Sequence, residues 1–137
     1  MKILAIDWGK RKIGVAISDN GCKIAFPRPY VKSSKKAIEE IMTVLDKERI
    51  KLVLIGWPLK ENGQNSETTE AAVKFYEKVK KRAKNVEVEL FDERYTSRIV
   101  DSVMDNFGLK WQQKVEIKDS LAAVVMLQGY LDAQPKN

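Results

Sequence analysis

Acidic residues stand at three places where an apolar segment of the chain begins or ends. Asp7 follows the apolar run Ile3–Ile6, Glu93 follows an alternating apolar run, and Asp119 precedes the apolar-rich segment Leu121–Leu131. Carboxylates brought close together repel one another, and a divalent cation with oxygen ligands relieves that repulsion. The three positions therefore predict a site for a divalent metal ion.

Each of these carboxylates has an alternative interpretation. Asp92 stands beside Glu93 and has the same ligand chemistry, and Arg94 can form an ion pair with either of them. Asp119 would also be favourable at the N-terminus of a helix without binding metal, because the helix dipole attracts negative charge there. Gly9 leaves room for a ligand to approach the backbone closely.

The amino-acid composition excludes several kinds of catalytic site. The 137 residues include no histidine and one cysteine. Zinc sites that use histidine, Ser–His and Cys–His nucleophile pairs and imidazole bases are therefore excluded, and so is an internal disulfide. A formal charge of +6 favours a polyanionic partner such as nucleic acid, although surfaces rich in Lys and Glu also occur in heat-adapted proteins. No apolar run approaches the about 20 residues of a membrane span, so we expect a cytoplasmic protein without membrane contact.

Cations and aromatic residues near the acidic positions suggest substrate contacts. Lys10 and Arg11 follow the first acidic strand and would neutralise phosphates, unless they form only a solvated hairpin tip. Trp111 lies among lysines, which suits stacking on an unpaired base, although a tryptophan can equally anchor its own loop. The basic run Lys78–Lys84 is expected to face water.

The hydrophobic pattern predicts five strands and four helices in the order βββαβαβαα. Strands are expected over 3–6, 13–17, 22–31, 52–56 and 86–90. Helices are expected after a cap at Ser33–Ser34, after the loop 63–65, over about 96–106 and over 119–132, with a polar loop before the last one.

This order predicts an α/β domain with a mixed five-stranded sheet flanked by helices. The first three strands would form an antiparallel meander, and the later strands would be parallel. If the first strand pairs with the fourth and the fourth with the fifth, Asp7 and Glu93 share the carboxyl edge of the sheet, with main chains about 10 Å apart. We expect one domain over residues 1–137, with 133–137 frayed.

At these residues the chain resembles the YqgF family, also described as Holliday-junction-resolvase-like proteins and as pre-16S ribosomal RNA nucleases, within the ribonuclease-H-like fold. The resemblance rests on Asp-x-Gly and Gly-Val-Ala-x-Ser-Asp within 7–19, Gly-x-Pro at 56–58, Asp-Glu-Arg at 92–94 and Asp-x-x-Ala-Ala at 119–123. It implies that Asp7, Glu93 and Asp119 are the catalytic, metal-binding set, with Mg²⁺ or Mn²⁺ as the ion. Lys10, Arg11, Arg94 and Trp111 are then expected to bind the substrate.

The expected function is that of a metal-dependent endonuclease that processes the 5′ end of pre-16S ribosomal RNA. A Holliday-junction resolvase acting on branched DNA is the alternative, since phosphate contacts carry no sequence information. A nucleic-acid-binding module that has lost catalysis would be expected to lack one of the three carboxylates. An ATPase of the actin and sugar-kinase type would need a second lobe. The number of metal ions and the oligomeric state stay open.

Overall fold

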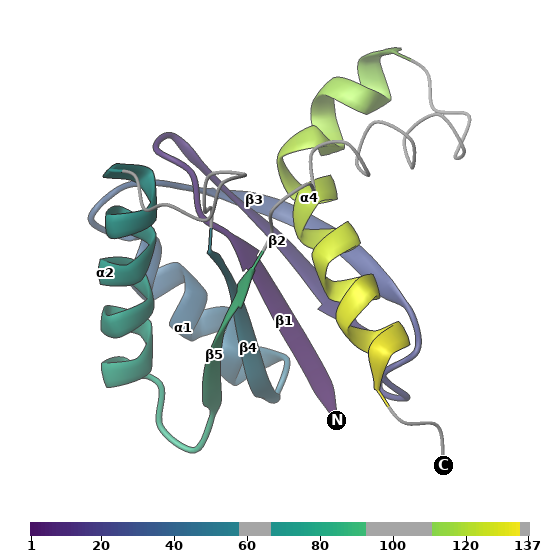
Figure 1. The fold of residues 1–137 in the computed structure, drawn as a ribbon, viewed down its shortest axis with the longest axis horizontal. Coiled ribbons are helices and arrows are strands. Elements are labelled where there is room, and N and C mark those ends of the chain that lie inside the picture. Colours follow the sequence, from purple (N-terminus) through teal and green to yellow (C-terminus); the bar gives the residue numbers. More distant parts are fainter. Residues whose placement is uncertain (58–66, 93–110, 135–137) are drawn as a thin grey trace.

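The computed structural model describes residues 1–57, 67–92 and 111–134, without the side chains of 57, 67–69, 92 and 111–119. The predicted helix over 96–106 and the last three residues lie outside this part. The elements, shown in Figure 1, are β1 (Lys2–Asp7), β2 (Lys12–Ser18), β3 (Ala25–Lys32), α1 (Ala37–Lys47), β4 (Ile50–Trp57), α2 (Glu67–Arg82), β5 (Glu87–Asp92) and α4 (Trp111–Ala133).

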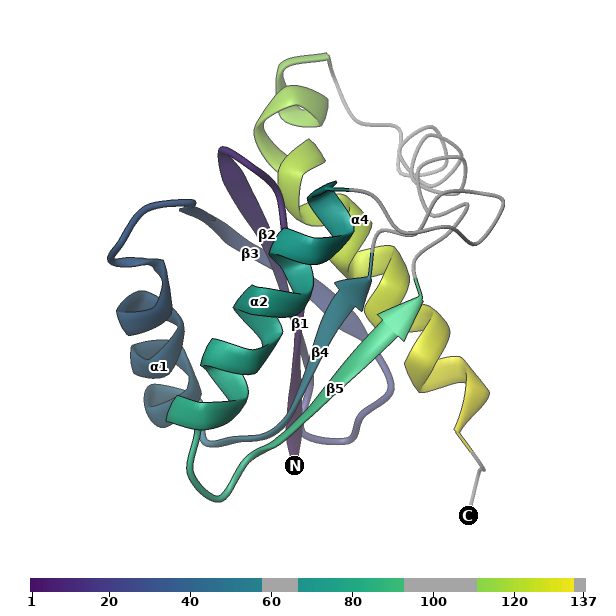
Figure 2. The same ribbon diagram turned by 60° about the vertical axis from the view of Figure 1, so that its left-hand side comes forward.

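The strands form one mixed sheet in the order β3-β2-β1-β4-β5. β1 pairs with β2 and β2 with β3 in antiparallel fashion, whereas β1 pairs with β4 and β4 with β5 in parallel. This arrangement confirms the predicted meander and parallel strands. Helices α1 and α2 cover one face of the sheet and α4 covers the other, as Figures 1 and 2 show.

The pleat of β1 divides the core into two clusters. Leu4 and Ile6 pack on the side of α1 and α2, while Ile3 and Ala5 pack on the side of α4. Each of these four side chains is almost completely buried. Because strand residues alternate between faces, Asp7 belongs to the α4 face, at the point where the buried part of the strand ends.

The predicted serine cap of α1 is wrong. The helix begins at Ala37 after Lys36, and no side chain caps it. The Ser34 hydroxyl accepts from the Lys36 amide at 3.2 Å, and the Ser33 hydroxyl donates to the Gly9 carbonyl. Both hydroxyls are therefore used in the β3–α1 connection, and Ser33 ties it to the connection between β1 and β2.

Helix α4 begins eight residues before the predicted start. The prediction of a polar loop is therefore wrong for residues 111–118. Residues 111–128 contain neither Gly nor Pro, and Gln, Lys and Glu in this segment are good helix formers. Asp119 consequently lies in the third turn of α4 and not at its N-terminus. A helix-dipole role for Asp119 is excluded, because that effect is limited to the first turn.

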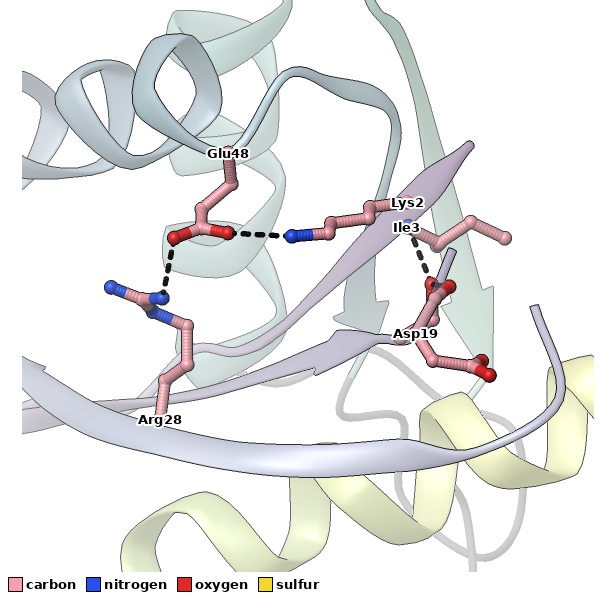
Figure 3. A network of polar contacts seen from close by, with 6 residues as sticks. Lys2, Ile3, Asp19, Arg28 and Glu48 are labelled. Atoms are coloured by element: carbon pink, nitrogen blue, oxygen red, sulfur yellow. Dashed lines mark hydrogen bonds and ion pairs between the residues drawn. The ribbon is translucent and has the colours of Figure 1, made fainter. Parts of the chain in front are cut away.

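An ion-pair network fixes the end of the sheet opposite Asp7. The Glu48 carboxylate accepts from Lys2 Nζ at 3.0 Å and from Arg28 Nη1 at 3.3 Å, as Figure 3 shows. The hydrogen bond and charge of Lys2, followed by the charge of Arg28, lower the pKa of Glu48. The network joins β1, β3 and the turn between α1 and β4.

Candidate active site

Asp7 lies at the carboxyl end of the central strand β1. It pairs with Gly14 of β2, and the preceding residue Ile6 pairs with Ile55 of β4. Asp7 is half-buried, whereas the strand behind it is fully buried. Its carboxylate therefore lies at the border between the core and the open edge of the sheet.

The end of β5 lies at the same edge. Phe91 is level with Gly56 of β4, and Asp92 is level with the next residue. Since neighbouring strands are about 4.8 Å apart, the main chain at the end of β5 lies about 10 Å from that of β1. Glu93 directly follows Asp92 in the sequence, and both Glu93 and Arg94 lie outside the described residues.

Ser120 connects α4 to the sheet beside Asp7. The Ser120 side chain is buried. Its hydroxyl accepts a hydrogen bond from the Val15 amide at 3.3 Å and donates one to the Arg28 carbonyl at 2.7 Å. Val15 and Arg28 are partners across β2 and β3, next to an irregularity in the register. One helix hydroxyl therefore bridges the two strands where their ladder is irregular.

The position of this bridge determines where Asp119 lies. Val15 pairs with Ile6, which is one residue from the Asp7–Gly14 pair. Asp119 immediately precedes Ser120 in α4, so its main chain lies close to the carboxyl end of β1. Figure 1 shows the N-terminal half of α4 near this end of the sheet. The side chain of Asp119 lies outside the described part.

A second polar side chain on α4 completes the attachment. The Gln128 carbonyl oxygen accepts from the Ala25 amide at 3.0 Å, and its amide group donates to the Lys23 carbonyl at 2.9 Å. Ser120 and Gln128 are separated by about 12 Å along the helix, and both bond the backbone of β3 or the turn before it. Together they fix the axial position of α4.

Ser120 is a functional position that the sequence motifs do not indicate. A signal was present, because Ser120 is spaced at helical intervals from the buried residues Val124, Leu127 and Leu131. A polar side chain in such a stripe needs a hydrogen-bond partner inside the protein. That reasoning would have indicated a specific contact between α4 and the sheet.

The basic hairpin between β1 and β2 is exposed. Lys10 and Arg11 lie at its tip, and the Ser33 amide donates to the Arg11 carbonyl at 2.9 Å. The room that Gly9 leaves for a ligand stays a prediction, and the glycine also has a structural reason. A Cβ atom at Gly9 would collide with the carbonyl oxygen of Lys12, so the glycine is required by the turn itself.

Two further residues of the sequence motifs have a defined place. Trp111 is the first residue of α4, and its side chain lies outside the described part. Asp19 lies at the opposite end of the sheet from Asp7 and accepts from the Ile24 and Lys23 amides at 3.1 and 2.8 Å. These backbone hydrogen bonds lower the pKa of Asp19, which therefore closes the turn between β2 and β3.

Within the described ranges no three metal-binding side chains form a cluster. Two of the three predicted ligands have side chains outside those ranges, so the sequence-predicted set is not tested by this observation. A hollow of about 730 Å³ lies where α1 and α2 end and β4 and β5 begin. It is at the wrong end of the sheet to include Asp7. No helix in the described part is long and apolar enough to cross a membrane.

The fold is shared with resolvases of known structure. The fowlpox virus resolvase, solved with substrate Holliday junction DNA, aligns with a TM-score of 0.60 and 16% identity over 99% of this chain and 100% of its own. RuvC of Thermus thermophilus, in complex with a Holliday junction substrate, aligns with a TM-score of 0.57 and 18% identity over 92% of both chains. The protein therefore has the ribonuclease-H-like fold of these nucleases.

The chain belongs to the RuvX family, whose model is described as "Holliday junction resolvase" and matches residues 1–133. A relative from Chloroflexus aurantiacus is 36% identical over 98% of this chain and 89% of its own length. A relative from Flavobacterium psychrophilum is also 36% identical, over 95% of this chain and 96% of its own length. Both are named "Putative pre-16S rRNA nuclease". The resemblance noted in the sequence is confirmed.

Proposed function

We propose that this protein is a divalent-metal-dependent nuclease whose site lies at the carboxyl edge of the sheet, around Asp7. The observation that supports this most strongly is the Ser120 bridge, which holds the main chain of Asp119 beside the end of β1. The end of β5, directly before Glu93, lies at the same edge. Family membership and the resolvase fold support the nuclease activity.

The residues at this edge fit a hard divalent cation. Asp7, Glu93 and Asp119 would hold Mg²⁺ or Mn²⁺ through carboxylate oxygens, the donors that these ions prefer. When bound, such an ion activates water and stabilises the negative charge that develops on the phosphate during hydrolysis. The chain lacks histidine, so these carboxylates supply the ligand set without nitrogen donors.

The basic residues of this edge would bind the substrate. Lys10 and Arg11 lie exposed on a hairpin whose backbone is held by Ser33, so their charges are available to phosphates near Asp7. Arg94, next to Glu93 in the sequence, is assigned the same role. Trp111 begins a helix and would stack on an unpaired base from that position.

Pre-16S ribosomal RNA is the substrate we favour, because it is the one in the names of the two relatives. Branched DNA is the second candidate, supported by the family description and by two fold relatives solved with Holliday junctions. The cytoplasmic location expected from the sequence is consistent with either and stays a prediction.

A comparison of three substrates tests this function. Purified protein is incubated with the 5′ region of pre-16S ribosomal RNA, an unrelated linear RNA and a four-way DNA junction, each with Mg²⁺, Mn²⁺ or EDTA. We expect cleavage of the pre-16S RNA that requires the metal. Cleavage of the junction alone would favour the resolvase, and metal-dependent cleavage of neither would favour a binding module without catalysis.

A further inference from the structure

A hollow of about 370 Å³ lies beside Asp7, on the face of the sheet that α1 and α2 cover. It is formed by the β1–β2 connection, the β3–α1 connection, the start of α1 and the exposed side of α2. We call it the Trp8 groove and define it by the residues that the argument uses: Trp8, Lys10, Lys35, Lys74, Phe75 and Lys78.

The Trp8 groove is strongly basic. The part of its lining that the structure describes includes four exposed lysines, Lys10, Lys35, Lys74 and Lys78, and no carboxylate. None of the four has an ion-pair partner within the described residues. By contrast, Lys2 and Arg28 are paired with Glu48. Four lysines around one hollow create a positive potential that attracts a polyanion.

The floor of the groove is apolar and partly aromatic. Phe75 is buried there, and half-buried Trp8 packs against the core cluster on this face while still lining the groove. Helix α1 begins at the same place and carries Glu39 and Glu40 in its first turn, so the basic character of the groove rests on its lysines. Aromatic surface surrounded by cations is the usual arrangement in sites for single-stranded nucleic acid.

The groove is continuous with the proposed active site. Trp8 follows Asp7 directly, and the Cα atoms of consecutive residues are about 3.8 Å apart. Asp7 belongs to the α4 face of the sheet, whereas Trp8 packs with the cluster on the opposite face. A nucleic-acid strand with one phosphate at Asp7 can therefore cross the edge of the sheet and enter the groove.

We propose that the Trp8 groove binds an unpaired stretch of the nucleic-acid substrate, with phosphates at the four lysines and a base against Trp8. The proposal rests on the proposed function, since it assigns the path of the strand away from the site at Asp7. A duplex is a poorer ligand, because its paired and stacked bases offer no free face to an aromatic side chain.

Binding measured in EDTA tests this groove separately from cleavage. The probes are fluorescein-labelled oligouridylate and oligothymidylate of about 12 nucleotides, within the range that single-strand sites cover, and an RNA duplex. The double variant Lys74→Gln, Lys78→Gln is compared with Lys47→Gln, Lys80→Gln. Both remove two positive charges from exposed helix lysines, but Lys47 and Lys80 do not line the groove.

We expect the groove variant to reduce the slope of log K against log salt for the single strands by about 1.4, which is two contacts of about 0.7 each. The control variant should change it much less. Trp8→Leu keeps an apolar side chain and should weaken single-strand binding about 5- to 150-fold. Equal losses on single strand and duplex, or equal slopes in the two double variants, would overturn the proposal.

The two proposals fail in distinguishable ways. If the nuclease assignment is wrong, the unmodified protein shows no metal-dependent cleavage, yet Lys74 and Lys78 still govern binding of the single strands. If the groove is wrong, cleavage is normal and the lysine pair leaves binding unchanged. A thermal melt of Trp8→Leu shows whether weaker binding comes from unfolding. If Trp8→Leu is unstable, the Lys74→Gln, Lys78→Gln variant decides whether the groove binds single strands.

Discussion

Ser120 links the catalytic proposal to the packing of the core. Its hydroxyl is the donor for one backbone group and the acceptor for another on neighbouring strands, and Asp119 is the adjacent residue in α4. The partners Val15 and Arg28 are 105 and 92 residues away in the sequence. The helical spacing of Ser120 with buried residues indicates that its hydroxyl needs a partner inside the protein. It does not indicate which partner, because only the folded sheet brings the three residues together.

Replacing Ser120 with Ala should therefore weaken both folding and activity. The Val15 amide and the Arg28 carbonyl would lose a partner in a buried place, which costs about 1–3 kcal/mol of unfolding free energy. Urea denaturation measures the loss of unfolding free energy. Cleavage, assayed where the variant stays folded, measures the loss of activity expected when Asp119 is displaced. Ser34→Ala, at an exposed serine, is the control. If both variants are equally stable, the bridge has no energetic role.

The sequence predicts helices and strands correctly where a single local hydrophobic pattern is strong. Alternation and short apolar runs predict all five strands, and β1 and β4 are continuous apolar strands buried on both faces. The order of the strands in the sheet agrees with the pairing that the sequence analysis assumed. The predicted start of α4 is wrong, because polarity alone does not distinguish a loop from a helix over residues 111–118, where no helix breaker is present. The serine cap of α1 failed because Ser33 bonds the β1–β2 connection, which is distant in sequence.

The contacts of Glu48 predict an acid-sensitive link between elements. Lys2 and Arg28 lower its pKa below the ordinary value of 4.5. Its contribution to stability is therefore complete above pH 4.5 and is lost as the pH falls through the lower pKa of the folded state. We expect Glu48→Gln to lower the melting temperature by a few degrees at pH 7, since such partly exposed pairs contribute little.

Melting curves of Glu48→Gln and the unmodified protein from pH 7 to pH 3 check this prediction. The difference between the two proteins should shrink as the solution becomes acidic. A difference that stays constant over this range would show that the charge of Glu48 is not what stabilises the link. Glu77→Gln, at an exposed glutamate of α2, gives the baseline for loss of one carboxylate.

On the scale of the whole molecule, the two faces of the sheet have different roles in the proposed function. The α4 face carries the main chain of Asp119 near the carboxyl end of β1, and the opposite face forms the basic Trp8 groove. The sheet edge between them carries the exposed hairpin with Lys10 and Arg11. The positive charge of +6 is thus partly concentrated around one end of a sheet whose proposed catalytic residues are acidic.

The most direct test of the proposed function is a titration of Mn²⁺ into the protein and into Asp7→Asn, Glu93→Gln and Asp119→Asn, with cleavage measured on the same samples. Each variant should lose cleavage and should bind Mn²⁺ at least about tenfold more weakly. Mutation of residues that only hydrogen-bond a metal ligand already weakens metal binding by about this factor. Each should keep its melting temperature, since removing one of three clustered charges relieves repulsion. Asp46→Asn, on α1, should behave like the unmodified protein. Equal Mn²⁺ affinity in all of them, or cleavage that persists in EDTA, would contradict the assignment of this edge as a metal-dependent nuclease site.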